Sequence, residues 1–125
     1  MGTINRKLIY EGSEGSKSLN TSFRLDTSIS CISFEAINGL ANAKKLYRPL
    51  QVSSNSLGQN LTIEYAICTD FYIDGIRLSD EFYVIPGLSE DAILGVNTFQ
   101  KWRIKLDFEH DTVIVDPKVA KAMLK

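Results

Sequence analysis

Short apolar stretches, separated by glycine and small polar residues, follow one another along the whole chain. Apolar or alternating runs of about four to eight residues between such breaks are typical of β-strands. The pattern predicts strands at 4–10, 19–25, 50–53, 61–68, 71–73, 76–85, 92–94, 104–108 and 112–115. We therefore expect an all-β fold in which helix is the minority element.

The breaks between these strands predict hairpins. Glu11 to Ser16 is a Gly/Ser turn that joins the first two strands, and Asp74-Gly75 suits the positive φ angles of a two-residue type I′ turn. The last two strands pair across 109–111. The polar segment 54–59 has too little apolar surface to be core, so we expect it to be the tip of a long hairpin arm.

Three segments have helical features. Apolar residues recur at three- and four-residue intervals in 34–43, which predicts one short amphipathic helix, although Gly39 weakens it. Segment 97–102 has room for one or two helical turns, in which we expect Trp102 to close the core. Pro117 stands at a helix-start position before a short terminal helix at 119–124.

Length and charge limit the kinds of protein this chain can be. A chain of 125 residues without repeats or linkers suits a single domain, 1–125. The net charge of -1 comes from 14 basic and 15 acidic residues spread along the chain, so we expect no nucleic-acid partner. There is no signal-peptide core and no apolar run of roughly 20 residues, so we expect no membrane partner and a cytoplasmic location.

The two cysteines, Cys31 and Cys68, lie in apolar stretches without a CxxC spacing or nearby histidines. We interpret them as buried thiols of an intracellular protein, although the sequence leaves a disulfide open because it does not report the distance between them. The only histidine, His110, falls in a predicted turn and is expected to be solvated. We therefore expect neither a metal site nor a cofactor.

One acidic residue has an unusual setting. Asp26 follows an apolar strand and precedes a second apolar, β-branched stretch, 29–32, so we expect its carboxyl to be partly buried. Burial raises a carboxyl pKa and is costly without hydrogen bonds, so the position requires either a structural partner or a function. Taken alone, Asp26 is better explained as a residue that caps a turn at the end of a strand, because Asp is a common turn residue.

The order of elements resembles the retropepsin family of aspartic peptidases over nearly the whole chain. The first similarity is the apolar-Asp-Thr/Ser-Gly signature, present here as Leu25-Asp26-Thr27-Ser28 before an apolar stretch and a short helix. The second is Ile93-Leu94-Gly95, preceded by the strand 82–86 and followed by a short helix and a closing hairpin. Between them lies the predicted hairpin arm, where the family has its flap. Neither motif is specific alone, and the order and spacing carry the resemblance.

The resemblance implies a closed acid-protease-like barrel with one or two short helices, which forms half of a two-fold symmetric homodimer. Asp26 of each chain would meet its counterpart, and the two carboxyls would share one proton because like charges so close cannot both ionise. The pair would activate a water that hydrolyses a peptide bond, without metal or cofactor. The implied function is an aspartic endopeptidase acting on a peptide or protein substrate.

The resemblance also implies roles for neighbouring residues. Thr27 would support the carboxyl pair, and Gly95 would let the strand formed by Ile93 and Leu94 cross close to the Asp26 loop. The hairpin tip would close over an extended substrate as an added strand pairs with a sheet; it consists of Ser54, Asn55, Ser56, Leu57, Gly58 and Gln59. Each has a structural alternative: a turn hydroxyl for Thr27, a helix-start glycine for Gly95 and an ordinary loop for the tip.

Ser28 departs from the family pattern, which has glycine at this position. A serine fits there if its φ angle stays negative, and its hydroxyl would then be able to donate to Asp26 and favour the ionised form. This predicts a more acidic activity profile than that of a Ser28→Gly variant. Ser28 is also compatible with a catalytically inactive peptide-binding or dimerisation module on the same fold.

Two further interpretations stay open. The chain is compatible with an unrelated small β-barrel in which Asp26 only caps a turn. Glu90 and Asp91, which precede an apolar strand, are either a second acid pair or a solvated turn.

Overall fold

The structure is a computed structural model that describes residues 3–54 and 59–119. Strands dominate this part of the chain, and the helical elements include a 3-10 helix, η1, and a short α-helix, α1. The elements in order are β1 (Ile4–Gly12), β2 (Gly15–Phe23), β3 (Cys31–Ser33), η1 (Glu35–Ile37), β4 (Lys44–Ser54), β5 (Gln59–Ile73), β6 (Ile76–Ile85), β7 (Ala92–Leu94), α1 (Val96–Trp102), β8 (Lys105–Asp107) and β9 (Thr112–Ile114). The expected mostly-β fold is confirmed.

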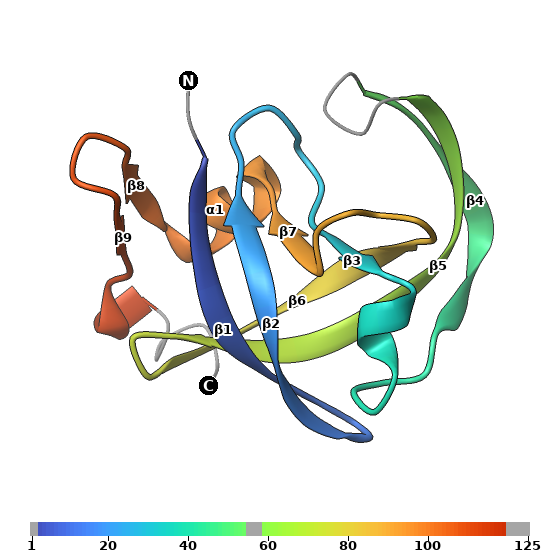
Figure 1. The fold of residues 1–125 in the computed structure, drawn as a ribbon, viewed down its shortest axis with the longest axis horizontal. Coiled ribbons are helices and arrows are strands. Elements are labelled where there is room, and N and C mark those ends of the chain that lie inside the picture. Colours follow the sequence, from blue (N-terminus) through green and yellow to red (C-terminus); the bar gives the residue numbers. More distant parts are fainter. Residues whose placement is uncertain (1–2, 55–58, 120–125) are drawn as a thin grey trace.

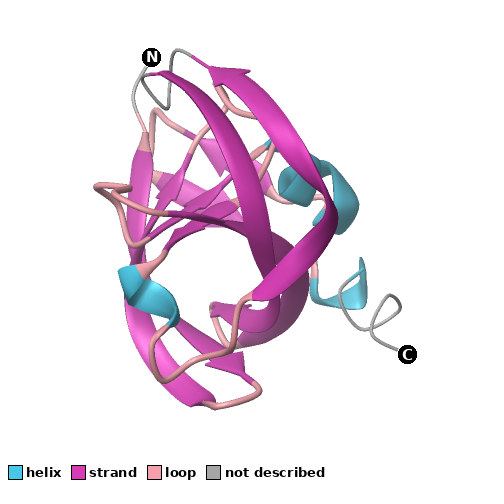
Figure 2. Ribbon diagram, turned by 90° about the vertical axis from the view of Figure 1, so that its right-hand side faces the viewer, coloured by secondary structure: helices cyan, strands magenta, loops and turns pink. Residues whose placement is uncertain are grey.

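Six strands form a closed barrel. The hydrogen-bonded order is β1-β2-β7-β3-β6-β5, and a further pairing of β1 with β5 closes the ring. Strand β4 lies outside the ring and pairs only with β5, so the two form the hairpin arm that curves along one side of the molecule (Figure 1). Turned by 90°, the strands are seen to curve around a common interior (Figure 2). The expectation of a closed barrel with short helices is confirmed.

The strand β7 lies between two strands that are consecutive in the chain. It runs parallel to β2 on one side and antiparallel to β3 on the other. The connection from β2 to β3, residues 24–30, therefore passes around the end of β7. Asp26 lies in this connection.

Aromatic and aliphatic side chains fill the barrel. Tyr10, Phe71 and Phe82 are fully buried, and their rings contact one another with centroids 5.7–5.9 Å apart. The hydroxyl of Tyr10 shares a hydrogen bond of 2.7 Å with that of Thr21. Trp102 is 1% exposed and its indole N–H donates to the carbonyl of Ser79 at 2.8 Å, so its expected place in the core is confirmed.

The turns follow the chemistry of their residues. Asp74 and Gly75 have φ angles of 51° and 78°, as a type I′ turn requires, and they join β5 to β6 as predicted. The expected terminal helix begins at Pro117, and residues 120–124 lie outside the described part.

The helix expected at 34–43 is wrong. Only the 3-10 helix η1 forms, because Asn38 adopts an extended ψ of 123° and Gly39 a positive φ of 78°. Of the four apolar residues whose spacing suggested the helix, Ile37, Leu40 and Ala41 are buried in the core, whereas Phe34 is exposed. The spacing of these residues therefore reflects burial of one side of an irregular segment and not a continuous helix.

The strand boundaries also differ. The strands expected at 61–68 and 71–73 are one continuous strand, β5, because Thr69 is buried within the sheet and Asp70 is paired with Arg77 of β6. Strand β4 begins at Lys44, earlier than expected, and its pairing with β5 shifts between Lys45 and Leu50. A strand that is paired with neighbouring strands tolerates polar residues within it, although the same residues look like the end of a strand in the sequence alone.

The two cysteines are free thiols. Cys31 is buried, and burial raises the pKa of its thiol to about 12, so it is unreactive. The expectation that both are buried is wrong for Cys68, which is exposed because its side chain projects from the outer face of β5. In the described ranges, no helix is both long and apolar enough to cross a membrane. Nor do three or more potential metal ligands gather anywhere in that part of the chain.

The packing of Phe71 predicts a large effect on stability. Phe71→Ala is expected to lower the free energy of unfolding by about 3–5 kcal/mol, because it leaves a cavity among the core rings. Phe34→Ala is the matched control, since Phe34 is 55% exposed and its loss is expected to change stability by no more than about 0.5 kcal/mol. Urea unfolding followed by fluorescence measures both. Equal effects of the two substitutions would contradict the placement of Phe71 in the core.

Candidate active site

Asp26 lies on the surface of the single chain. Strand β2 ends at Phe23, so by Leu25 and Asp26 the backbone has left the sheet and bends at the end of the barrel. The Asp26 side chain is 57% exposed and that of Leu25 is also exposed. The expectation of a partly buried Asp26 is wrong for the single chain, because the apolar stretches on either side enter the barrel and the bend between them does not.

The loop that carries Asp26 is fixed to the segment where β7 ends and α1 begins. The backbone N–H of Arg24 donates to Leu94 at 3.0 Å. Beyond Asp26, the carbonyls of Thr27 and Ser28 accept hydrogen bonds of 3.0 Å from the backbone N–H groups of Val96 and Asn97. The loop is therefore held on both sides of Asp26 by the same short segment.

Gly95 allows this close contact. A Cβ atom at Gly95 would lie 2.9 Å from the carbonyl oxygen of Thr27 and 2.8 Å from the carbonyl carbon of Ile29, and closer still to the carbonyl oxygen of Ile29. These are backbone atoms, so they cannot move aside as a flexible side chain would. The structure thus brings together Ile93, Leu94 and Gly95 with the loop of Asp26, Thr27 and Ser28, as the two sequence motifs suggest.

A buried polar network under the loop was not identified from the sequence. The hydroxyls of Ser30 and Thr98 share a hydrogen bond of 2.5 Å, and Ser30 Oγ also accepts the N–H of Gly95 at 3.0 Å. Thr98 Oγ1 donates in turn to Asp80 Oδ2 at 2.7 Å. The only signal in the sequence is a serine within the apolar stretch 29–32, which by itself does not indicate a partner.

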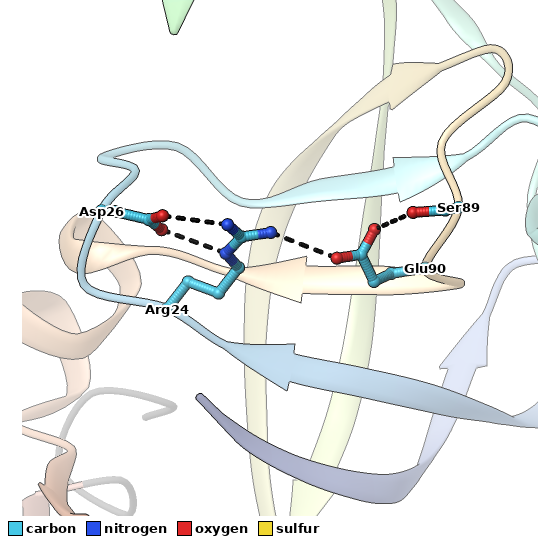
Figure 3. A network of polar contacts seen from close by, with 4 residues as sticks. All are labelled: Arg24, Asp26, Ser89 and Glu90. Atoms are coloured by element: carbon cyan, nitrogen blue, oxygen red, sulfur yellow. Dashed lines mark hydrogen bonds and ion pairs between the residues drawn. The ribbon is translucent and has the colours of Figure 1, made fainter. Parts of the chain in front are cut away.

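The Asp26 carboxylate is paired with an arginine two residues before it. Arg24 donates from Nε to Oδ1 at 3.0 Å and from Nη2 to Oδ2 at 2.9 Å, so its guanidinium covers both carboxylate oxygens. Arg24 Nη1 reaches Glu90 Oε2 at 3.1 Å, and the hydroxyl of Ser89 donates to Glu90 Oε1 at 2.6 Å (Figure 3). The hydrogen bond and charge of Arg24 hold the pKa of Asp26 below its usual range, against a smaller opposing effect of desolvation.

The neighbours of Asp26 differ in exposure. Thr27 is buried, whereas Ser28 is exposed. Ser28 is not among the residues with a positive φ angle, so the backbone here does not require a glycine. Where the sequence suggested a bond from the Ser28 hydroxyl to Asp26, the structure has Arg24 as the carboxylate's partner.

The hairpin arm ends at the same end of the molecule as the Asp26 loop (Figure 1). Ser54 pairs with Gln59 at the described end of the arm, and the expected tip residues Asn55, Ser56, Leu57 and Gly58 lie outside the described residues. A second apolar cluster runs along this arm and joins it to the barrel next to the loop. It comprises Cys31, Ile63, Ile85 and Ile93, with Ile29, Leu46, Leu50, Val52, Leu61, Tyr83 and Leu88 partly buried against them.

The other candidate residues from the sequence are Glu90, Asp91 and His110. Glu90 and Asp91 are not an acid pair, because Glu90 binds Arg24 while Asp91 Oδ2 accepts the backbone N–H of Asn20 at 3.0 Å. His110 is exposed and pairs with Asp107 at 2.8 Å in the β8–β9 turn. Arg24 was missed because an arginine at the end of a strand is ordinary in a sequence, and its partners become evident only in three dimensions.

Comparison with known proteins gives structural relatives only. No protein-family model matches the sequence, and no curated protein matches it. Among solved structures, the retroviral protease-like domain of Ddi1 from Leishmania major is similar with a TM-score of 0.69 and 14% identity, over 93% of this chain and 90% of that one. EIAV protease, complexed with the inhibitor HBY-793, is similar with a TM-score of 0.61 and 16% identity, over 86% of this chain and 94% of that one.

Both similarities extend over most of the length of the matched chains, and one of these is a retroviral protease-like domain and the other a protease. At these identities the likeness extends to the path of the chain and not to individual residues. The chain therefore has the retroviral protease-like fold.

Proposed function

We propose that the protein is an aspartic endopeptidase that acts as a homodimer, with one Asp26 from each chain at the catalytic centre. The observation that supports this most is the position of Asp26. In a chain with the retroviral protease-like fold, it lies in the loop that passes around the end of β7, and its carboxylate faces solvent at the end of the barrel. An exposed acid on a rigidly held loop is suited to meet a second carboxyl from a partner.

The chemistry follows from bringing two such carboxyls together. At close range only one of them ionises, so the pair shares a proton. The ionised carboxylate takes a proton from a water, the water oxygen attacks the peptide carbonyl, and the protonated carboxyl polarises that carbonyl. A proton then passes to the leaving amine, the C–N bond breaks, and the pair regains its shared proton.

The surrounding residues have supporting roles in this proposal. Thr27 places its hydroxyl toward the partner's loop, Ser28 lies beside the carboxyl pair, and Gly95 keeps the loop in position. The tip, Ser54 to Gln59, acts as a flap over an extended substrate whose backbone pairs with the enzyme as an added strand. The apolar cluster along the arm favours a substrate with apolar side chains flanking the cleaved bond.

The proposed partners are a second copy of the chain and a peptide or protein substrate, and the mechanism requires no metal or cofactor. The two free thiols, one of them exposed, fit a reducing compartment such as the cytoplasm.

Peptide cleavage tests the activity. The full chain, incubated with a mixed peptide library at roughly pH 3 to 8, which brackets shifted carboxyl values, is expected to cut peptides. Asp26→Asn is expected to lower the rate by roughly 10³-fold or more, because it removes the ionisable group that activates water. Asp74→Asn is the matched control, since Asn also tolerates the positive φ of the turn. If every peptide stays intact, the chain is an inactive peptide-binding or dimerisation module instead.

The shared catalytic centre predicts a second result. Activity per chain is expected to rise with protein concentration and to level off where sedimentation shows the dimer to be complete, because a single chain holds only half of the carboxyl pair. An excess of Asp26→Asn chains added to the native protein is expected to lower its activity by forming mixed dimers. The same excess of an unrelated protein serves as the control. Full activity of a strict monomer would refute the dimeric centre.

A further inference from the structure

Arg24 is held between two acidic side chains that come from different loops. Its guanidinium covers both oxygens of Asp26, and its remaining nitrogen reaches Glu90 in the loop between β6 and β7 (Figure 3). The Arg24 side chain is 17% exposed, against 31% for Glu90 and 57% for Asp26. The cation is thus the most enclosed of the three groups.

Backbone hydrogen bonds fix the positions of Arg24 and Glu90 relative to each other. Arg24 follows directly on β2, and its N–H is bonded to Leu94 at the end of β7. Glu90 lies just before β7 begins, and its carboxylate accepts a hydrogen bond from the hydroxyl of Ser89. Because β7 is hydrogen-bonded to both β2 and β3, the two loops have little freedom to separate. Arg24 therefore stays within reach of both carboxylates.

Two other acidic groups nearby have different partners. Asp91 is bonded to the N–H of Asn20, and Asp80 to Thr98 and Lys101. Arg103 and Lys105 line a hollow beside Leu25. The charged side chain that acts directly on the Asp26 carboxyl is thus Arg24, and the ones that act on Arg24 are Asp26 and Glu90.

We propose that Arg24 is a positioning residue for Asp26, which it both orients and holds in the ionised form, and that Glu90 regulates this hold by competing for the same guanidinium. An arginine stays charged at every pH at which a protein is folded, so its effect does not switch off. A fork of two N–H groups on a carboxylate is a strong and directional contact. Glu90 binds the remaining nitrogen of the guanidinium, Nη1, and offsets part of its positive charge.

The consequence for the proposed reaction concerns pH, and it depends on Asp26 being catalytic. The carboxyl pair works only while one proton is shared, and activity falls on the alkaline side when that proton is lost. Arg24 favours the ionised form and so lowers the pH at which the proton leaves. A two-fold dimer brings two such arginines to one centre, which restricts activity to more acidic conditions than the pair alone would allow.

The first experiment measures the Asp26 carboxyl itself and needs no activity. Carbon NMR titration of the labelled full chain, with the resonance assigned by its loss in Asp26→Asn, gives the apparent pKa of the Asp26 carboxyl, a value that belongs to the pair where the dimer forms. Arg24→Gln is expected to raise this pKa, because the ionised form loses its partner. Glu90→Gln is expected to lower it, because the guanidinium then acts on Asp26 without competition and a nearby negative charge is gone.

The control for this titration is another Arg–Asp pair. Arg77→Gln removes the partner of Asp70, which Arg77 Nε contacts at 2.9 Å, and is expected to leave the Asp26 pKa unchanged. An Asp26 pKa that is the same in Arg24→Gln and in the native chain would overturn the proposal. So would shifts of the same sign in Arg24→Gln and Glu90→Gln.

The second experiment follows peptide cleavage against pH. The alkaline limb is expected to move to higher pH in Arg24→Gln and to lower pH in Glu90→Gln, whereas a purely structural role would lower the rate at every pH without moving the limb. If the native chain cuts no peptide, the proposed function fails and the titration still decides the role of Arg24. If it cuts peptides and the Asp26 pKa is unmoved in Arg24→Gln, the proposed function stands and this inference fails.

Discussion

The passage of β7 between β2 and β3 fixes the geometry of the end of the barrel that carries Asp26. Two strands that are consecutive in the chain are kept apart by a third that arrives some 60 residues later. The loop between them must then bend around the end of β7, and Gly95 is the residue that lets the two backbones touch. Hydrogen bonds from Val96 and Asn97 complete the contact. A carboxyl placed in that loop is held still although it is exposed to water.

Rigid support and exposure together are what a catalytic or binding group needs, because a group that must be reorganised before it acts contributes less. The buried hydroxyls of Ser30 and Thr98 support the loop from the barrel side, where an unpaired polar group would be costly. On the solvent side, Arg24 and Glu90 set the charge around Asp26. Buried hydroxyls thus support the loop from beneath, whereas the charges that act directly on the Asp26 carboxylate lie on its solvent side.

The arm that β4 forms with β5 extends the sheet outside the closed barrel. Because β4 lies outside the closed ring, it has a partner on one side only and is free to curve away from the barrel. The arm stays attached to the barrel through an apolar cluster that includes Ile63 and Ile93 and reaches the start of β3. The same cluster touches the segment that supports Asp26, so the arm and the loop are parts of one end of the molecule.

Local alternation, turn chemistry and a few residues in a fixed order were enough to predict most strands, most of their turns and the motifs at Asp26 and Gly95, but not the short strand β3, whose three residues are all buried. The sequence by itself did not determine where polar residues interrupt a strand, as at Asp70, nor that the apolar spacing of 34–43 is compatible with an irregular segment. The exposure of Asp26 and its pairing with Arg24 and Glu90 were decided only by the tertiary structure. Glu90 is far from Arg24 along the chain, and only the β2–β7 pairing brings the two loops together, so no local pattern could report that contact.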